Sequence, residues 1–155
     1  MSKSVKRVEQ AAADLGLEIR VERMPESTRT AKDAAAACGC DVGQIVKSLI
    51  FEGEMSGELI LLLVSGGHDV DLIKVSQIIG DTLKRADPNR IRSETGFAIG
   101  GVAPIGHLIP IKSYFDKTLL TYENVWAAAG APNAVFNVKS QKLFDVLQAE
   151  LIEVC

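Results

Sequence analysis

The sequence has few of the side chains that metal binding, redox chemistry and catalytic triads require. Its 155 residues include two histidines and three cysteines. Cys38 and Cys40 are separated by one residue, whereas the pairs of thioredoxin-like and zinc-ribbon proteins are separated by two. No second Cys/His pair lies nearby to complete a zinc site. We therefore expect no metal and no cofactor, and free thiols that fit a reducing, cytoplasmic compartment.

Long hydrophobic runs and a strong charge of one sign are also missing. The longest apolar run, Leu59–Val64, is far shorter than the ~18 residues of a membrane-spanning helix, so we expect no membrane association. The 17 Lys and Arg residues against 20 Asp and Glu residues give a net charge of −3. This charge argues against a basic surface that coats nucleic acid nonspecifically, but it permits one small, locally positive site.

The remaining composition is that of an ordinary folded domain. Hydrophobic residues make up 47% of the chain and charged residues 24%, which are typical globular values. A chain of this length can bury a hydrophobic core without disulfide bonds or a structural metal ion. No linker, internal repeat or low-complexity tract divides it, so we expect residues 1–155 to form a single domain.

Periodicity and capping signals predict helices and strands in no regular alternation. Helices are expected over residues 5–16, 30–38, 71–79, 88–95 and 140–147. Strands are expected over residues 17–22, 45–51, 58–64, 82–86, 133–138 and 151–154. Residues 125–129 fit either element, because alanine favours helix while Gly130 and Pro132 bound the segment closely. The mixture predicts the α+β class.

Lys47 stands out within the predicted strand over residues 45–51. It shares one face of that strand with Ile45, Leu49 and Phe51, and an unpaired ammonium buried among apolar side chains is costly. Pattern alone leaves two interpretations open. The lysine either reaches water from a strand end, or it lies at the mouth of a cleft and binds an anion such as a phosphate or carboxylate.

A glycine pair with a proline three residues later is the second feature. Gly100 and Gly101 allow close approach of the backbone and exposure of its amide groups, and Pro104 stiffens the next part of the chain. Such amides can bind a carbonyl oxygen and stabilise developing negative charge. The alternative is an ordinary sharp loop between strands. No Gly-Lys-Ser/Thr sequence comes after the glycines, so this is not a phosphate-binding P-loop.

The two histidines and a short basic run carry weaker signals. His68 is interpreted as a surface-loop residue, whereas His107 lies near the glycine pair and is a candidate pocket residue. No nucleophile elbow or metalloprotease motif accompanies them. The basic residues at 84, 85, 90 and 92 usually indicate a solvated face, and they also fit a phosphate-backbone contact.

Taken together, the lysine strand and the glycine-proline loop resemble the YbaK/ProX family of aminoacyl-tRNA deacylases. The chain is also similar to the editing domain inserted in bacterial prolyl-tRNA synthetases. The segments that carry the resemblance stand in the family's order and cover most of the chain from Arg20 onward. They are Glu26–Ala31, Gly43–Leu49, Val64–Gly66 with Val70–Leu72, Gly100–Gly106, and Val125–Gly130 with the strand after it.

The resemblance implies a fold and an activity. The fold is one α+β domain with a curved, barrel-like mixed sheet flanked by helices, in which residues 125–129 form a strand. The activity is hydrolysis, in trans, of the ester that joins a wrong amino acid to tRNA. The implied partner is the aminoacylated acceptor end of tRNA, with a synthetase as a further candidate. Neither a metal nor a covalent protein nucleophile is implied.

The same resemblance assigns roles by position. Lys47 is expected to hold the phosphate side of the terminal adenosine. Gly100 and Gly101 are expected to present backbone amides to the ester carbonyl, within the GxxxP loop that ends at Pro104. Besides Pro104, four further residues are expected to bind substrate without a family position that assigns them: Thr30, Ser48, His107 and Asn133.

One departure from the family pattern concerns specificity. Some relatives carry a histidine in the C-terminal part of the pocket, whereas here no histidine occurs after His107 and the loop at residues 131–133 reads Ala-Pro-Asn. The amino acid removed, the tRNA and the oligomeric state therefore stay open. Two other functions also stay open: a binding module that holds a nucleotide or tRNA end without chemistry, and an unrelated hydrolase that uses His107 or Cys38.

Overall fold

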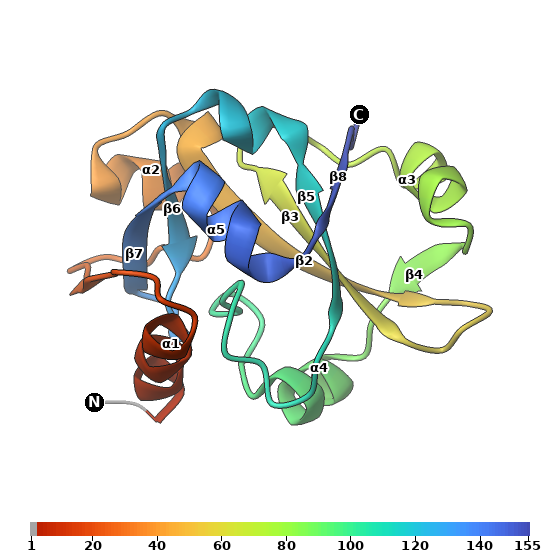
Figure 1. The fold of residues 1–155 in the computed structure, drawn as a ribbon, viewed down its shortest axis with the longest axis horizontal. Coiled ribbons are helices and arrows are strands. Elements are labelled where there is room, and N and C mark those ends of the chain that lie inside the picture. The colour runs from red at the N-terminus through yellow and green to blue at the C-terminus, as the bar shows by residue number, and fades with distance from the viewer. Residues whose placement is uncertain (1–2) are drawn as a thin grey trace.

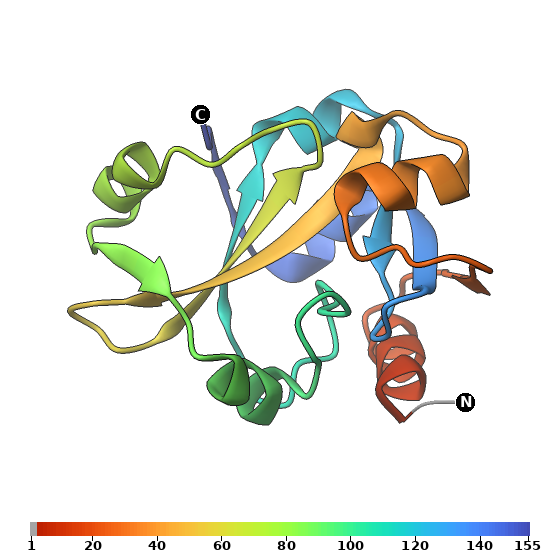
Figure 2. The same ribbon diagram turned by 180° about the vertical axis from the view of Figure 1, so that it is seen from behind.

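A mixed sheet of eight strands runs through the molecule, and helices lie against both of its faces (Figures 1 and 2). The computed structural model describes residues 3–155. The strands are β1 (Val21–Arg23), β2 (Ile45–Gly53), β3 (Leu59–Ser65), β4 (Leu83–Arg85), β5 (Lys112–Asp116), β6 (Asn124–Ala128), β7 (Ala134–Lys139) and β8 (Glu150–Ile152). The helices are α1 (Lys3–Asp14), α2 (Ala31–Cys38), α3 (Leu72–Ile79), α4 (Pro88–Thr95) and α5 (Ser140–Leu147), with the 3-10 helices η1 (Val42–Gln44) and η2 (Lys117–Thr121).

The strands stand in the order β1-β7-β6-β2-β3-β5-β8, and β4 pairs with β2 outside this path. Three pairings are parallel, namely β2 with β6, β3 with β5, and β5 with β8. The others are antiparallel. Within residues 3–155, β1 and β8 do not pair with each other, so the sheet is open rather than a closed barrel.

Strand β2 lacks a strand partner along part of one edge, and the candidate site described below lies at that edge. Most of its length, from Val46 to Glu52, pairs with β3 on the other edge. On this edge it pairs with β6 only at Ile45 and Val46, and with β4 only from Phe51 to Gly53. Residues 47–50 therefore have no strand partner there. The loop over residues 97–111, which we call the glycine loop, curls between α1 and α4 below this part of the sheet in both views (Figures 1 and 2).

Strand β3 is the centre of the core. Every residue from Leu59 to Ser65 is buried, because apolar groups cover both of its faces. Leu61 and Leu63 pack in a cluster that includes side chains of α1 and α5. The alternate residues of β3 pack in a second cluster with Val75 of α3. Burial on both faces explains why this strand is a continuous apolar run rather than an alternating one.

Helix ends are set by local capping. Thr30 accepts a hydrogen bond from the Asp33 amide (3.0 Å) at the start of α2, and Gly39 ends that helix in the left-handed conformation (φ 67°). Asp71 and Asp87 cap α3 and α4 in the same way. Short polar side chains supply acceptors for the first free amides of a helix, so these boundaries were predictable from the sequence.

The predicted α+β class with a mixed sheet flanked by helices is confirmed. The segment over residues 125–129, which was ambiguous by pattern, belongs to strand β6 up to Ala128. Several predicted bounds shift by one or two residues, such as the last strand, predicted over residues 151–154 and found at Glu150–Ile152. Two differences are larger. The strand expected over residues 17–22 pairs only from Val21 to Arg23, and β5 was not predicted. Every helix within residues 3–155 is too short or too polar to span a lipid bilayer.

Candidate functional site

A cavity of about 480 Å³ lies at the open edge of β2. The start of α2, residues 46–49 of β2, β6 and the glycine loop form its walls. Helix α2 is held against the start of β2 because Ala34 and Ala35 pack on Ile45. Adjacent strand residues normally point to opposite faces, yet Lys47 and Ser48 both line the cavity. The missing strand partner at residues 47–50 leaves this edge open to the cavity.

Lys47 brings an uncompensated positive charge to this cavity. Its side chain is half-buried, and its ammonium donates a hydrogen bond to the backbone carbonyl of His68. It forms no ion pair with a carboxylate among residues 3–155. A carbonyl orients an ammonium without cancelling its charge, and two of its three donors remain for a ligand. The Lys47 ammonium is therefore available to bind an anionic ligand.

Asp116 supports the loop that positions Lys47, and sequence reasoning missed it. The residue is almost fully buried (1% exposed). Its carboxylate accepts hydrogen bonds from the amides of Ser65 (3.0 Å) and Thr118 (3.0 Å) and contacts Nδ1 of His68 (2.9 Å). These contacts fix the segment whose carbonyl receives the Lys47 ammonium. The signal in the sequence was an acidic residue directly after the apolar pair Tyr114 and Phe115.

The glycine loop reaches the cavity at Gly100. This residue has φ +90°, a conformation that L-residues avoid. The Gly101 amide closes the turn by donating to the Ala98 carbonyl (3.0 Å). Gly100 and Val102 line the cavity, whereas Gly101 does not, and neither of their amides has a hydrogen-bond partner within residues 3–155. Ile99 also lines the cavity without a partner for its amide, so the loop offers three unbonded amides at the cavity wall, those of Ile99, Gly100 and Val102.

Arg29 is a second cation on the cavity wall that sequence reasoning did not single out. It is exposed, and its side chain lies over the glycine loop, where a Cβ added to Gly100 would come within 3.3 Å of its Cγ. It makes no ion pair within residues 3–155. No acidic residue among those described lines the cavity. The cavity thus has two positive charges and none of the opposite sign, which favours an anionic ligand.

Ser48 and Thr30 supply hydroxyl groups to the cavity wall. The Ser48 hydroxyl is the one buried side-chain N or O atom among the described residues that has no hydrogen-bond partner. A buried polar atom without a partner costs stability, so a ligand that bonds it recovers that cost. The Thr30 hydroxyl already accepts a hydrogen bond from the Asp33 amide. Thr30 lies at the cavity because it caps the start of α2.

The other predicted site residues lie outside the cavity wall. Pro104 is buried in the glycine loop. Nε2 of His107 contacts the Ala103 carbonyl (2.7 Å), and its ring meets the Phe97 ring edge-on. The Asn133 amide group reaches the Met24 carbonyl (3.5 Å). In the structure the His107 and Asn133 side chains therefore contact backbone carbonyls of loops rather than the cavity.

His107 should make stability depend on pH. Burial lowers its pKa below the ordinary 6.5 and nearby Arg7 lowers it further, while the hydrogen bond to Ala103 opposes the change. Between the two pKa values the unfolded chain binds more protons than the folded one, so stability falls as the pH drops below about 6.5. We expect the urea midpoint of His107→Gln to fall less between about pH 7.5 and 5.5 than that of the unchanged protein. Parallel losses in both proteins would contradict this role.

Cys38 and Cys40 lie in surroundings that disfavour the thiolate form. Burial raises the pKa of Cys38 to about 11, with neighbouring Cys40 and Glu22 adding to the effect. Burial likewise raises the pKa of Cys40. Nucleophilic cysteines have lowered pKa values, so the shift at Cys38 is opposite to the one that activates a thiol. Among residues 3–155, no three His, Cys, Asp or Glu side chains are placed to hold a metal ion.

Comparisons with known proteins bear on the family of this chain. The family model described as "Aminoacyl-tRNA editing domain" matches residues 25–146. An uncharacterized protein, YwhH of Bacillus subtilis, is 30% identical over 87% of this chain and 86% of its own length. The proline–tRNA ligase of Thermosipho melanesiensis is 30% identical over 83% of this chain, which spans only 23% of that enzyme.

A solved structure extends the likeness to the whole fold. It is described as "a putative trans-editing enzyme for prolyl tRNA synthetase" and is 45% identical to this chain, with a TM-score of 0.92 over 99% of this chain and 98% of that one. The matched residues 25–146 include the whole cavity wall, from Thr28 to Val135. The chain therefore belongs to the aminoacyl-tRNA editing domain family.

Proposed function

We propose that this protein hydrolyses the ester between an amino acid and the 3′-terminal adenosine of tRNA, acting in trans as a deacylase of mischarged tRNA. The observation that carries the proposal is the pairing of an uncompensated cation, Lys47, with the free amides of the Gly100 turn in one cavity. The membership in the editing-domain family supports it. The solved relative described as a trans-editing enzyme supports the activity in trans.

The chemistry needs few protein groups. Lys47 holds the phosphate of the terminal adenosine by a charge-assisted hydrogen bond. The ester carbonyl lies against the glycine loop, where backbone amides stabilise the negative charge that forms on its oxygen. Water adds to the carbonyl carbon, the bond to the ribose oxygen breaks, and that oxygen leaves with a proton as a hydroxyl group. The substrate's own ribose hydroxyl assists the attacking water. The cavity's main contribution is to position the ester, and positioning can supply much of the rate acceleration.

Within the glycine loop we assign the donor role to the three unbonded amides at the cavity wall, which include that of Gly100. Gly101 was the other expected donor, but its amide is bonded to the Ala98 carbonyl (3.0 Å). A Cβ at Gly101 would come within 3.2 Å of the Ala131 backbone, so this glycine permits close packing of two loops. Its proposed role is to shape the turn, and Pro104 stiffens the chain after it.

Ser48 is proposed to contact the substrate's polar groups. Its unpartnered hydroxyl lines the cavity beside apolar groups of Ile45 and Trp126. A site that must satisfy a buried hydroxyl favours substrates that offer a partner and rejects those that do not. We therefore expect the cavity to select the amino acid by the polarity of its side chain as well as by its size.

The test is deacylation of a panel of mischarged tRNAs that includes alanyl-, cysteinyl- and seryl-tRNA. We expect at least one of these esters to be hydrolysed well above its spontaneous rate at low protein concentration. Correctly charged prolyl-tRNA serves as the matched control and is expected to persist. If every substrate stays intact at the background rate, the deacylase proposal fails.

A second candidate is a binding module that holds a nucleotide or tRNA end without chemistry. One observation favours it: no histidine, cysteine or acidic residue among those described lines the cavity, so no side chain there is a conventional general base. Binding of uncharged tRNA or adenosine monophosphate that depends on Lys47, with no turnover of any ester, would establish this alternative.

A further inference from the structure

Arg7 of helix α1 joins the start of the glycine loop to its returning limb. Its Nε donates a hydrogen bond to the carbonyl of Gly106 (2.8 Å), and its Nη2 donates one to the carbonyl of Gly96 (2.8 Å). Both glycines have the left-handed conformation (φ 82° and 80°). A Cβ on Gly96 would collide with Nη2 of Arg7. The two limbs are therefore shaped to admit this guanidinium between them.

The same guanidinium packs on the first aromatic ring of the loop. Its Cζ lies 4.7 Å from the ring centroid of Phe97, which is buried. On the other limb, His107 meets the Phe97 ring edge-on and contacts the Ala103 carbonyl (2.7 Å). Only two residues separate Phe97 from Gly100. A fixed Phe97 thus restricts the positions that the unbonded amides of the Gly100 turn can take.

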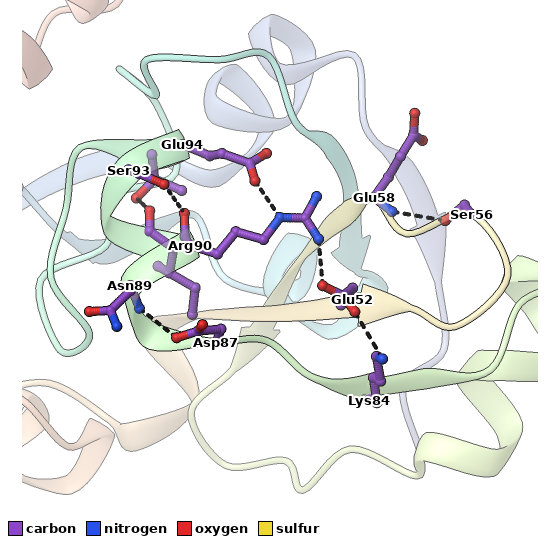
Figure 3. Close-up of polar contacts among 11 residues, drawn as sticks. Glu52, Ser56, Glu58, Lys84, Asp87, Asn89, Arg90, Ser93 and Glu94 are labelled. Atoms are coloured by element: carbon purple, nitrogen blue, oxygen red, sulfur yellow. Dashed lines mark hydrogen bonds and ion pairs between the residues drawn. The ribbon is translucent and has the colours of Figure 1, made fainter.

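Helix α4, from which the loop starts, is itself tied to the sheet (Figure 3). Arg90 of this helix forms ion pairs with Glu52 of β2 and with Glu94, and Lys84 of β4 pairs with the same Glu52 (3.0 Å). The amides of residues 108–109 bond to carbonyls in the last turn of α4 and close the base of the loop. Beyond this base, the guanidinium of α1 provides the next link between the limbs.

We propose that Arg7 is a positioning residue for ester hydrolysis, which holds the glycine loop so that the unbonded amides of the Gly100 turn meet the oxygen on which negative charge develops. The inference rests on the proposed function. Arg7 does not line the cavity and precedes the matched residues 25–146, so it acts through the loop. Groups that stabilise a transition state must be held within about 0.5 Å of their productive positions.

The competing role for Arg7 is a contact that stabilises the fold without affecting the chemistry. Kinetics separate the two roles, because an interaction made only in the transition state changes kcat and leaves KM unchanged. We expect Arg7→Met to lower kcat about tenfold and to change KM by less than about twofold, since misplaced amides slow the reaction while Lys47 still binds the phosphate. Hydrolysis of the best ester of the panel, in folded protein, gives both constants.

Two further variants complete the comparison. Lys6→Met is the matched control, because Lys6 is the adjacent residue of α1, is exposed and forms no ion pair within residues 3–155. It should change neither constant. Arg7→Lys keeps the charge but lacks the planar fork of donors, so its kcat should lie between those of Arg7→Met and the unchanged protein. It provides the same test if Arg7→Met does not fold.

Hydrogen exchange of peptides that cover residues 97–106 measures the loop without any turnover. We expect faster exchange in Arg7→Met than in the unchanged protein or in Lys6→Met, because the loop opens more readily. A loss of thermal stability with unchanged kcat would overturn the positioning role, and so would a rise in KM as large as the fall in kcat. If the unchanged protein hydrolyses no ester, the deacylase proposal fails, and exchange still decides whether Arg7 holds the loop.

Discussion

Replacement of Lys47 by methionine is expected to lower kcat/KM for ester hydrolysis by about 100-fold, which corresponds to about 2.7 kcal/mol of transition-state stabilisation. Methionine keeps the apolar length of the side chain and removes the ammonium. The cavity wall then retains only Arg29 as a cation among the described residues. Because the substrate's phosphate loses its charge-assisted contact, the ester carbonyl is no longer held in place against the glycine loop.

The measurement is single-turnover hydrolysis of the best substrate of the panel, with thermal unfolding as a check on folding. Lys47→Arg is the matched control, because it keeps the charge while changing the geometry, and it should retain more activity than Lys47→Met. A folded Lys47→Met protein with unchanged kcat/KM would remove Lys47 from the mechanism and, with it, the observation on which the proposed function depends.

Replacement of Asp116 by alanine is expected to cost about 3 kcal/mol of unfolding free energy, because it removes the acceptor of the buried Ser65 amide, of the half-buried Thr118 amide and of the His68 ring. The loss should also free the segment that carries the His68 carbonyl, and with it the partner of the Lys47 ammonium. Urea denaturation gives the free energy. In addition, kcat/KM of Asp116→Ala should be lower than that of the unchanged protein at urea concentrations below the unfolding midpoint, where the variant is still folded.

Asp116→Asn and Asp145→Ala separate the hydrogen bonds from the general effects of losing an acid. Asparagine keeps one acceptor oxygen, so its cost should lie between those of the aspartate and the alanine proteins. Asp145 lies on the surface helix α5, where its carboxylate accepts a hydrogen bond from Gln141, so its replacement should change stability by less than about 0.5 kcal/mol. A cost for Asp116→Ala as small as that of Asp145→Ala would refute the support role.

The strand that contains Asp116 illustrates where sequence reasoning stopped. Residues 112–116 are buried increasingly toward Asp116, and β5 takes its place by parallel pairing with β3 and β8. Parallel partners come from distant parts of the chain, so no local turn signal announces such a strand. By contrast, the antiparallel hairpin of β2 and β3 was predictable, because its turn and both apolar runs are contiguous.

Local patterns in the sequence were enough to predict the capped helices, the hairpin and the mixed α+β class. It also singled out Lys47, Ser48 and the Gly100 loop. Which of the predicted site residues share one cavity could be seen only in the folded chain. That outcome depends on the gap between β6 and β4 along β2. It also depends on contacts between distant segments, such as the hydrogen bonds from Arg7 to the carbonyls of Gly96 and Gly106. Long-range pairing and packing leave no periodic trace in the sequence, because they join residues that lie far apart along the chain.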